Sequence, residues 1–525
     1  MVKALDKSGL EDKLGALQSA LASDFRGELL TDDFSRALYA TDASIYQQRP
    51  VLVALPREPE DLEVLVKACR QCEVPITARG GGTSLAGQTV GFGVAVDTSK
   101  YLNRLLRVVP EQGWAEAEPG LVLNDLNDQL QAYGYMFAPD PATAEHACVG
   151  GVVANNSSGT RSIRYGKTVD HVEGLSFLCG EGELHSFKVM DRDALARSLR
   201  GSTRTSDLIK GLVSMTNSNA ELVGSRYPKL LRRVTGYNLD EMLRGLVAVG
   251  YELPEFTGLR APAAPPVRGF NPASMLVGCE GSLGLITRAK LRITPKPRFT
   301  GLIVSHYNSL KEALLGNAVL LTTDPTASEL MDRMVLSLAQ KQLSISRLMG
   351  FLDGEPNSVV ITEYTADTQA ELEHKLKQAG DLLSKESASY AHPHFTDGVL
   401  KTQIWQVRKA GLPLLLGLPG NRKPVAFIED TAVDPSRLVE YVERFDQIVQ
   451  SHGTTAAYYA HASVGCLHIR PLLDLKSEAD IQTMARLSDE ISDLVMEFEG
   501  SMSGEHGDGL ARGLWNKKQF GPVIY

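Results

Sequence analysis

Two short, glycine-flanked segments near the C-terminus carry side chains that are well suited to bind a metal ion. The first contains His461 and His468, with six residues between them, and the second contains Glu505 followed directly by His506. Two imidazoles and a carboxylate form a three-ligand set that suits an open catalytic site for a divalent cation, and nitrogen ligands favour Zn²⁺. Two histidines at this spacing are, taken alone, more often structural. The Glu-His pair shifts the balance, because polar residues fixed in loops usually face a ligand.

Three glycine-rich segments in the first half could cradle phosphate groups. They cover residues 79–84, 150–159 and 278–284. Glycines let backbone N–H groups approach an anion closely, and consecutive amides form anion-binding nests. One such segment alone fits a ligand-free turn equally well, whereas three favour a large, multi-part ligand that carries phosphate. The chain has no G-x-G-x-x-G dinucleotide motif, and the P-loop-like residues 166–168 lack the earlier glycine that a P-loop requires.

Length and composition exclude several classes of protein. The 525 residues predict three or four folding modules, and a 43% hydrophobic, 22% charged composition is typical of globular proteins. A net charge of −9 argues against a non-specific nucleic-acid binder. Six scattered cysteines indicate reduced thiols rather than a disulfide framework. We expect a cytoplasmic protein without a transmembrane segment, which could still bind at the inner membrane through a redox partner.

The elements that must position these side chains are mixed helices and strands. Strand-like residues 74–77 lead directly into the first glycine-rich segment, a second strand follows at 94–97, and residues 190–270 read as an excursion from the core. Another strand is predicted at residues 275–277. After a proline-containing linker at 295–297, helices and strands alternate. The predicted helices are 310–322, 329–343, 368–386, 434–451 and 477–499, and the predicted strands are 302–306, 358–363, 424–429, 454–459 and 465–470.

The order of the three glycine-rich segments resembles FAD-binding domains of the vanillyl-alcohol oxidase type over residues 45–295. The motifs are ARGGGTSLAGQ at 78–88, the GGVVANNSSG stretch at 150–159 and CEGSLGLIT at 279–287. Some relatives attach flavin covalently through a histidine near the first motif. None lies between Arg79 and Gln88, so we expect non-covalent FAD. The resemblance assigns cofactor binding to Arg79, Gly80, Gly81, Gly82, Thr83, Ser84, Gln88, Pro139, Thr143, Gly150, Gly151, Asn155, Ser158, Gly159, Glu280 and Ile286.

The two histidine segments resemble motifs of FAD-dependent D-2-hydroxyacid dehydrogenases, the group that contains D-lactate and D-2-hydroxyglutarate dehydrogenases. The resemblance implies that His506 is the general base and that Arg408 and Lys423 pair with a substrate carboxylate. It assigns the metal to His461, His468 and Glu505.

The sequence departs from the family pattern at two positions. Arg470 stands where single-domain members often have Asn, and Leu412 stands where the hydroxyglutarate enzymes commonly have Thr. The pattern H-x6-H-x-R-P is more like large members fused to an iron–sulfur half. The added guanidinium suggests a second substrate carboxylate, so D-2-hydroxyglutarate is favoured and D-lactate comes next. The chain has no C-x2-C-x2-C-x3-C-P cluster motif, so an iron–sulfur domain or subunit, or another electron acceptor, is expected as the partner.

Together these observations predict an α+β fold. We expect an N-terminal helical segment at 1–45, a two-subdomain FAD-binding domain at 46–296, and an α+β substrate or cap domain with an antiparallel sheet at 297–525, incomplete at its C-terminus.

Two other functions are considered. The chain could be a flavin-binding electron-transfer subunit without its own substrate, which has no reason to keep the histidine segments. It could also be a sugar or lactone oxidase, a class that usually carries a flavin-linking histidine and lacks the metal set.

The basic residues 226–233 are interpreted as a solvated helix face, or less often as a docking site for a membrane or redox partner.

Overall fold

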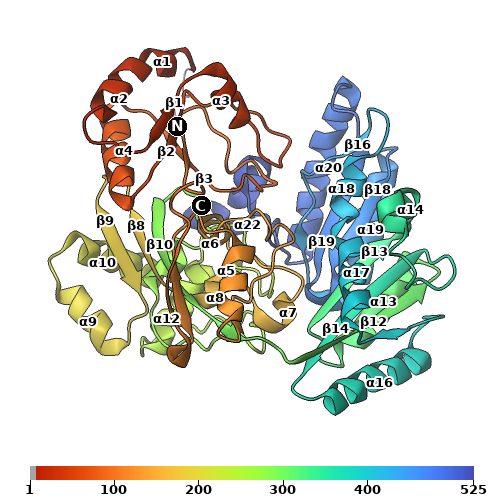
Figure 1. Cartoon of the computed structure of the whole chain (residues 1–525). Helices are drawn as coiled ribbons and strands as arrows, with labels where there is room; N and C mark the ends of the chain where they lie inside the picture. Colours follow the sequence, from red (N-terminus) through yellow and green to blue (C-terminus); the bar gives the residue numbers. More distant parts are fainter. Residues whose placement is uncertain (1–6) are drawn as a thin grey trace.

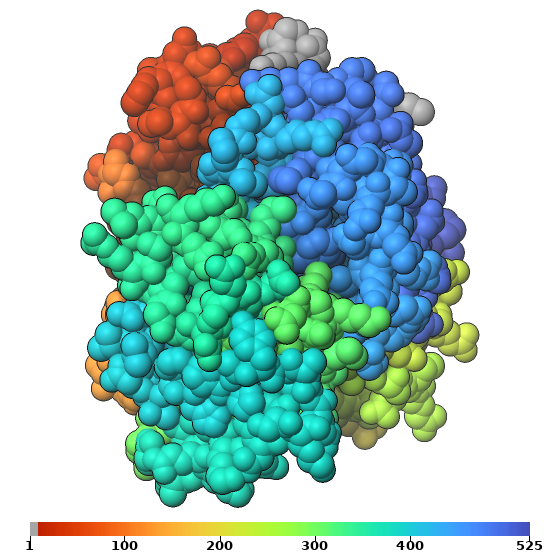
Figure 2. Space-filling view, turned by 90° about the vertical axis from the view of Figure 1, so that its right-hand side faces the viewer, coloured from red at the N-terminus to blue at the C-terminus, as the bar shows by residue number. Residues whose placement is uncertain are grey.

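The computed structural model describes residues 7–525, which form two lobes (Figure 1). The first lobe contains the N-terminal half of the chain, coloured red to green, and the second contains the residues that follow, coloured green to blue. The C-terminal end returns to the first lobe. In the view of Figure 2, the second lobe covers most of the visible face, with N-terminal residues at the upper left.

A four-stranded sheet lies at the N-terminal end of the first lobe, in the order β1-β2-β4-β3. Its strands are β1 Glu28–Leu30, β2 Leu52–Leu55, β3 Ile76–Arg79 and β4 Val94–Asp97. β2 and β3 each run parallel to β4, whereas β1 is antiparallel to β2. Helix α4 Pro59–Gln71 connects β2 to β3 and buries Leu62 and Leu65; Pro59 suits its first turn because its missing N–H needs no partner there.

The N-terminal segment is not wholly helical. It contains the helices α1 Lys7–Asp12, α2 Leu14–Leu21 and α3 Asp33–Leu38, but β1 interrupts them because residues 28–30 pair with β2. The first six residues of the predicted segment lie outside the described residues.

A five-stranded antiparallel sheet forms the centre of the first lobe, in the order β5-β6-β10-β8-β9. Its strands are β5 Leu105–Val109, β6 Trp114–Ala117, β8 Val172–Leu178, β9 Leu184–Lys188 and β10 Leu285–Arg292. β7 Tyr135–Met136 and β11 Thr294–Pro295 form a separate pair. The helices around this sheet are α5 Leu123–Gln131, α6 Val149–Ala154, α7 Ser162–Tyr165 and α8 Thr168–His171, with a 3₁₀ turn at Pro110–Gln112.

The excursion predicted at 190–270 is a helical insertion whose two ends meet. Met190 and Phe270 exchange backbone hydrogen bonds of 2.8 and 2.9 Å. Its helices are α9 Arg192–Arg200, α10 Arg204–Ser218, α11 Ala220–Arg226 and α12 Leu239–Ala248. The strand predicted at 275–277 is wrong, because the 3₁₀ turn Pro272–Met275 occupies its start and β10 begins only at Leu285.

An antiparallel sheet with helices on both faces forms the second lobe, in the order β15-β12-β14-β13-β18-β19-β16, with β17 also paired to β19. Its strands are β12 Phe299–Tyr307, β13 Ala327–Asp332, β14 Ser358–Ala366, β15 His394–Phe395, β16 Lys423–Pro424, β17 Thr431–Ala432, β18 Ala456–His461 and β19 Cys466–Leu473. Its helices are α13 Leu310–Leu321, α14 Arg333–Lys341, α15 Leu343–Ser346, α16 Gln369–Glu386, α17 Gly398–Lys409, α18 Gly411–Leu416, α19 Leu438–Ser451 and α20 Glu478–Glu497, with 3₁₀ turns at Pro435–Arg437 and Ala462–Val464.

Two predictions for the second lobe differ from the structure. The helix predicted at 329–343 begins later, because β13 occupies residues 327–332 and Asp332 then caps α14 through the N–H of Val335. The strand predicted at 424–429 is reduced to β16 at its start. The antiparallel sheet and the mixed helix-and-strand class are confirmed.

The C-terminal residues pack against the first lobe. They contain α21 Gly509–Arg512, the 3₁₀ turn Gly513–Trp515 and α22 Asn516–Ile524. Phe520 of α22 is buried in the core of the first lobe and lies 4.8 Å, centroid to centroid, from the ring of Tyr227. The segment from 501 to 512 therefore passes between the lobes, and the Glu505–His506 pair lies within it.

Candidate active site

The first glycine-rich segment forms the loop between β3 and β4 and leaves no room for side chains. A Cβ at Gly81 would lie 2.1 Å from the carbonyl oxygen of His146, and Gly82 has a φ of +64°. Arg79 ends β3 just before the loop. The sequence therefore needs glycine here so that the loop backbone can approach the neighbouring residues and any bound ligand closely.

One cavity of about 480 Å³ joins the glycine loops to the histidine segments. Of the residues that the sequence assigned to the cofactor, all line it except Pro139 and Gly159. Pro139 is buried, and a Cβ at Gly159 would lie 2.0 Å from the carbonyl oxygen of Asp140, which itself lines the cavity. The predicted residues that line it are Arg79, Gly80, Gly81, Gly82, Thr83, Ser84, Gln88, Thr143, Gly150, Gly151, Asn155, Ser158, Glu280 and Ile286.

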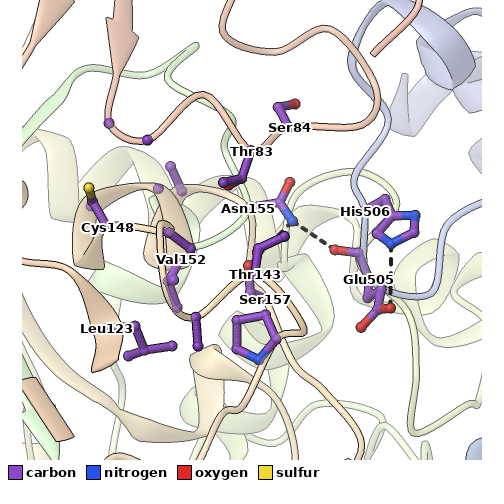
Figure 3. Close-up of a pocket in the computed structure, with 18 of the residues that line it drawn as sticks. Thr83, Ser84, Leu123, Thr143, Cys148, Val152, Asn155, Ser157, Glu505 and His506 are labelled. Atoms are coloured by element: carbon purple, nitrogen blue, oxygen red, sulfur yellow. Dashed lines mark hydrogen bonds and ion pairs between the residues drawn. The ribbon is translucent and has the colours of Figure 1, made fainter. Parts of the chain in front are cut away.

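Three of these residues also hold the Glu505–His506 loop. Asn155 Nδ2 donates to the carbonyl of Glu505 at 2.7 Å (Figure 3). Gln88 Nε2 donates to the carbonyl of His506 at 2.7 Å. The carboxylate of Glu280 accepts from the N–H groups of residues 508 and 509, at 2.6 and 2.8 Å. Burial and the nearby Asp508 raise the pKa of Glu280 to about 7. The loop is thus fixed to the first lobe at several points.

Three imidazoles converge on one carboxylate oxygen in this loop. The Nε2 atoms of His461, His468 and His506 lie 2.9, 3.0 and 3.4 Å from Glu505 Oε1. His461 ends β18 and His468 lies on the paired strand β19, so the hairpin brings the two rings to a centroid distance of 5.1 Å. Ligand atoms ~2.1 Å from one tetrahedral ion stand about 3.4 Å apart, so donors at these separations fit a shared divalent cation.

Two buried glutamates orient the imidazoles from behind. Glu329 Oε1 lies 2.7 Å from His461 Nδ1, and the carboxylate of Glu429 contacts the Nδ1 atoms of His468 and His506 at 3.0 and 2.7 Å. Metal-binding histidines characteristically donate their second N–H to such a carboxylate, which leaves Nε2 free for the metal. Sequence reasoning missed both residues. A signal existed only for Glu429, which directly follows the apolar run 424–428.

Asp430 lies close enough to belong to the ligand set, but its oxygens are already used. Ligand atoms of Asp430, His468, Glu505 and His506 lie within 4.8 Å of one another. However, the carboxylate of Asp430 accepts from the backbone N–H groups of Glu505 and His506, at 3.0 and 2.8 Å, and from the hydroxyl of Ser503 at 2.5 Å. These contacts indicate that Asp430 shapes the loop, and His461, whose Nε2 lies 2.9 Å from Glu505 Oε1, stays a candidate ligand beside His468 and Glu505.

The cluster is built to hold positive charge around Glu505. Burial disfavours a charged His506, but Glu429 and Asp430 outweigh it and raise the pKa of His506 to about 10. In the same way, Glu329 and Glu505 outweigh burial and raise the pKa of His461. The pKa of Glu505 is held well below its usual range, because His461 and Arg232 outweigh its burial. Protons on these imidazoles and a divalent cation beside Glu505 would therefore compete with each other.

One face of helix α17 and the start of α18, both in the second lobe, also border the cavity. Trp405, Arg408, Lys409 and Leu412 all line it, at the spacing of one helical face. Arg408 Nη2 lies 2.7 Å from Glu329 Oε2, so this guanidinium borders both the cavity and the histidine cluster. Sequence reasoning found Arg408 and missed Lys409.

The structure does not bring the other two predicted carboxylate anchors into the cavity. Lys423 is exposed on β16 and its Nζ contacts the carbonyl of Leu418. Arg470 is 1% exposed and does not line the cavity; its Nη2 lies 3.6 Å from Glu429 Oε2. Arg470 therefore faces Glu429 behind the histidines, and this placement does not support contact between its guanidinium and a second substrate carboxylate.

The basic residues 226–233 are not a solvated surface face, and that prediction is wrong for two of its arginines. Arg232 and Arg233 are 0% and 1% exposed. Arg232 Nη2 lies 2.5 Å from Glu505 Oε2, and Arg233 Nη2 lies 2.5 Å from Asp240 Oδ1. Arg232 is neutralised by Glu505, 273 residues further along the chain, whereas Arg233 is neutralised by Asp240, which is only seven residues away.

None of the helices within residues 7–525 combines the length and apolar character needed to cross a bilayer.

Comparison with known proteins matches two family models to the chain: "FAD binding domain" over residues 50–188 and "FAD linked oxidases, C-terminal domain" over residues 296–525. A D-2-hydroxyglutarate dehydrogenase of Pseudomonas putida is 31% identical over 94% of this chain and 48% of its own length. A D-lactate dehydrogenase of Anaerostipes hadrus is 24% identical over 95% of this chain and 89% of its own length. The crystal structure of p-cresol methylhydroxylase has a similar fold, with a TM-score of 0.64 and 12% identity over 99% of this chain and 93% of its own. The chain spans about half the length of the curated D-2-hydroxyglutarate dehydrogenases it matches.

Proposed function

We propose that this chain, which belongs to the FAD-linked oxidases, oxidises a D-2-hydroxy acid to the corresponding 2-oxo acid, with D-2-hydroxyglutarate as the favoured substrate and D-lactate next. The single observation that carries the proposal is the shared cavity, in which the glycine loops and the cluster of His461, His468, Glu505 and His506 face the same space. An electron-transfer subunit without a substrate has no use for that cluster, and a sugar or lactone oxidase usually lacks it.

In this proposal FAD occupies the part of the cavity between the glycine loops. The amides of the first loop and Arg79 would meet the pyrophosphate, and the residues from Gly150 to Ser158 would lie along the rest of the cofactor. The cation would be held by His461, His468 and Glu505, with Zn²⁺ favoured by the two nitrogen ligands. When bound, the cation would acidify the substrate hydroxyl, and FAD would accept the hydride at N5.

His506 is the proposed base that takes the hydroxyl proton. It lines the cavity, its Nδ1 is held by Glu429 at 2.7 Å, and its Nε2 is directed toward the ligand cluster. The bond to Glu429 fixes the ring and stabilises the protonated form that results. A cation held by Glu505 would add positive charge beside this imidazole and would lower its pKa from the high value that the carboxylates impose, which would favour the neutral base.

Arg408 is the proposed partner of the C1 carboxylate, because its guanidinium borders the cavity beside the cluster. The favoured dicarboxylate needs a second cation at a distance. Lys409 supplies it: this residue also lines the cavity, and no hydrogen bond or ion pair engages its ammonium within the described residues. Lys409 takes the place that the sequence gave to Lys423 and Arg470.

Electrons must leave the reduced flavin, so the proposal includes a redox partner. An iron–sulfur domain or subunit is the acceptor that the sequence pattern implies, and a cytoplasmic location, with attachment at the inner membrane through that partner, completes the proposal.

Anaerobic mixing with D-2-hydroxyglutarate, D-malate, D-lactate and L-lactate tests the reaction. Hydride delivery bleaches the flavin absorbance near ~450 nm. We expect bleaching by the D-hydroxy acids, fastest with D-2-hydroxyglutarate, and none by L-lactate. A flavin that no 2-hydroxy acid bleaches would overturn the proposed function.

A further inference from the structure

We propose that Arg232 is a positioning residue that fixes the candidate metal ligand Glu505 and joins it to the flavin-side loop at residues 157–162. The inference rests on the proposed function, since it concerns the cation that Glu505 would bind. Arg232 Nη2 contacts Glu505 Oε2 at 2.5 Å, while its Nη1 donates to the carbonyl of Gly159 at 3.0 Å and to the hydroxyl of Ser162 at 2.8 Å. The two ends of one guanidinium thus reach the ligand and the loop.

The two oxygens of Glu505 have different surroundings. The three imidazole Nε2 atoms face Oε1, whereas Arg232 engages Oε2. With Oε2 occupied in this way, the carboxylate would offer only Oε1 to a cation and would bind it through one oxygen. The planar fork of an arginine can hold Oε2 and the loop at once; a lysine ammonium at the same place can neutralise charge but cannot reproduce that geometry.

Stability alone does not explain this buried ion pair. Desolvating a guanidinium and a carboxylate is costly, and replacing buried ion pairs by apolar residues is often neutral or stabilising. Arg232 is fully buried, and its Nε atom has no hydrogen-bond partner within the described residues. The positions of its other two nitrogens, on the ligand and on the loop, therefore point to an orienting role.

The same contacts link the flavin site to the metal site. Ser157, Ser158 and Thr160 line the flavin side of the cavity, so a ligand that orders this loop also orders the groups that hold Arg232. Arg232 in turn orders Glu505. Because coupling between two binding sites is reciprocal, FAD should strengthen cation binding, and the cation should strengthen FAD binding by the same factor.

The test measures Zn²⁺ affinity by competition with a chelating dye, on the flavin-loaded full chain. Arg232→Lys should weaken Zn²⁺ binding 10- to 100-fold, which is the usual cost of losing an outer contact to a metal ligand. Arg233→Lys is the matched control, because Arg233 is equally buried but pairs with Asp240 instead of Glu505; it should stay within twofold of the wild type. An Arg232→Lys protein that also stays within twofold would overturn the inference.

Ser162→Ala provides a milder variant that removes one hydroxyl and keeps both charges. It should reduce the factor by which FAD strengthens Zn²⁺ binding, measured on flavin-loaded and flavin-depleted protein. If Arg232→Lys does not fold, Ser162→Ala is the test. In that case, an unchanged ratio of Zn²⁺ affinities with and without FAD would contradict the coupling through Arg232. A wild-type chain that binds no Zn²⁺ would overturn the proposed metal function together with this inference, whereas wild-type binding with unaffected variants would overturn the inference alone.

Discussion

His461 Nδ1 lies 2.7 Å from Glu329 Oε1, although 132 residues separate the two in the chain. Glu329 is completely buried on β13, where residues 330 and 331 pair with β18 beside the end of that strand at His461. A buried carboxylate so close to an imidazole fixes the ring orientation and directs Nε2 toward Glu505.

Replacing Glu329 with Gln should therefore weaken cation binding. Gln keeps the volume but loses the charge that favours a donating Nδ1–H, so we expect Zn²⁺ affinity to fall 10- to 100-fold in dye competition. Glu118→Gln is the control: Glu118 is also buried, with its Oε1 2.8 Å from an Arg104 nitrogen, but it does not line the cavity or contact the cluster. Equal Zn²⁺ affinity in the two variants would contradict the role of Glu329.

His506→Ala should slow the proton transfer strongly and leave FAD bound. General acid–base catalysis typically contributes ~10²–10⁴-fold, so the rate of flavin bleaching by D-2-hydroxyglutarate should fall by about that factor. The flavin absorbance and the Zn²⁺ content should remain. A variant that retains both and still bleaches at the wild-type rate would show that His506 is not the base.

Lys409→Met should raise KM for D-2-hydroxyglutarate about three- to tenfold, the cost of one partly exposed charge-assisted contact. D-lactate lacks the second carboxylate, so its KM should not change. Lys423→Met separates the two lysines, because the sequence resemblance assigns the carboxylate to Lys423 and the cavity assigns it to Lys409. If the dicarboxylate-specific loss appears in Lys423→Met instead, the assignment to Lys409 is wrong.

Cation binding should strengthen as the pH rises. The carboxylates raise the pKa of His461, and that of His506 to about 10, so both imidazoles in the cation-free protein keep their protons to higher pH than free histidine does. A cation needs neutral His461 as a ligand and disfavours a charged His506, so binding must release protons, and affinity falls as the pH drops. Calorimetry in buffers of different ionisation enthalpy measures that release. A Zn²⁺ affinity that is flat between about pH 6 and pH 9 would contradict these raised pKa values.

The parts of the site that lie on local patterns could be predicted from the sequence. The strands expected at 454–459 and 465–470 form the β18–β19 hairpin, which places Tyr459 opposite His468 and brings the two histidines of the first segment together. The sequence could also place the glycine-rich segments near one ligand, because closely spaced glycines mark tight loops whose backbone can approach a ligand closely.

The supporting charges could not be predicted, because their partners are distant in the sequence. Residues 329–343 read as one helix, and only pairing with β14 and β18 shows that Glu329 lies on a buried strand. The basic residues 226–233 resemble a solvated face, since charge pattern alone does not reveal that Glu505 neutralises Arg232 from 273 residues away. The prediction for Lys423 rests on its motif position alone, and the structure leaves this residue exposed on β16, outside the cavity lining.

The most direct test of cation-dependent oxidation at this cavity is anaerobic flavin bleaching by D-2-hydroxyglutarate before and after verified metal removal. We predict that bleaching disappears from the metal-free, flavin-loaded protein and returns when Zn²⁺ is added back. Full bleaching at an unchanged rate by protein shown to contain no metal would contradict the central role of His461, His468 and Glu505.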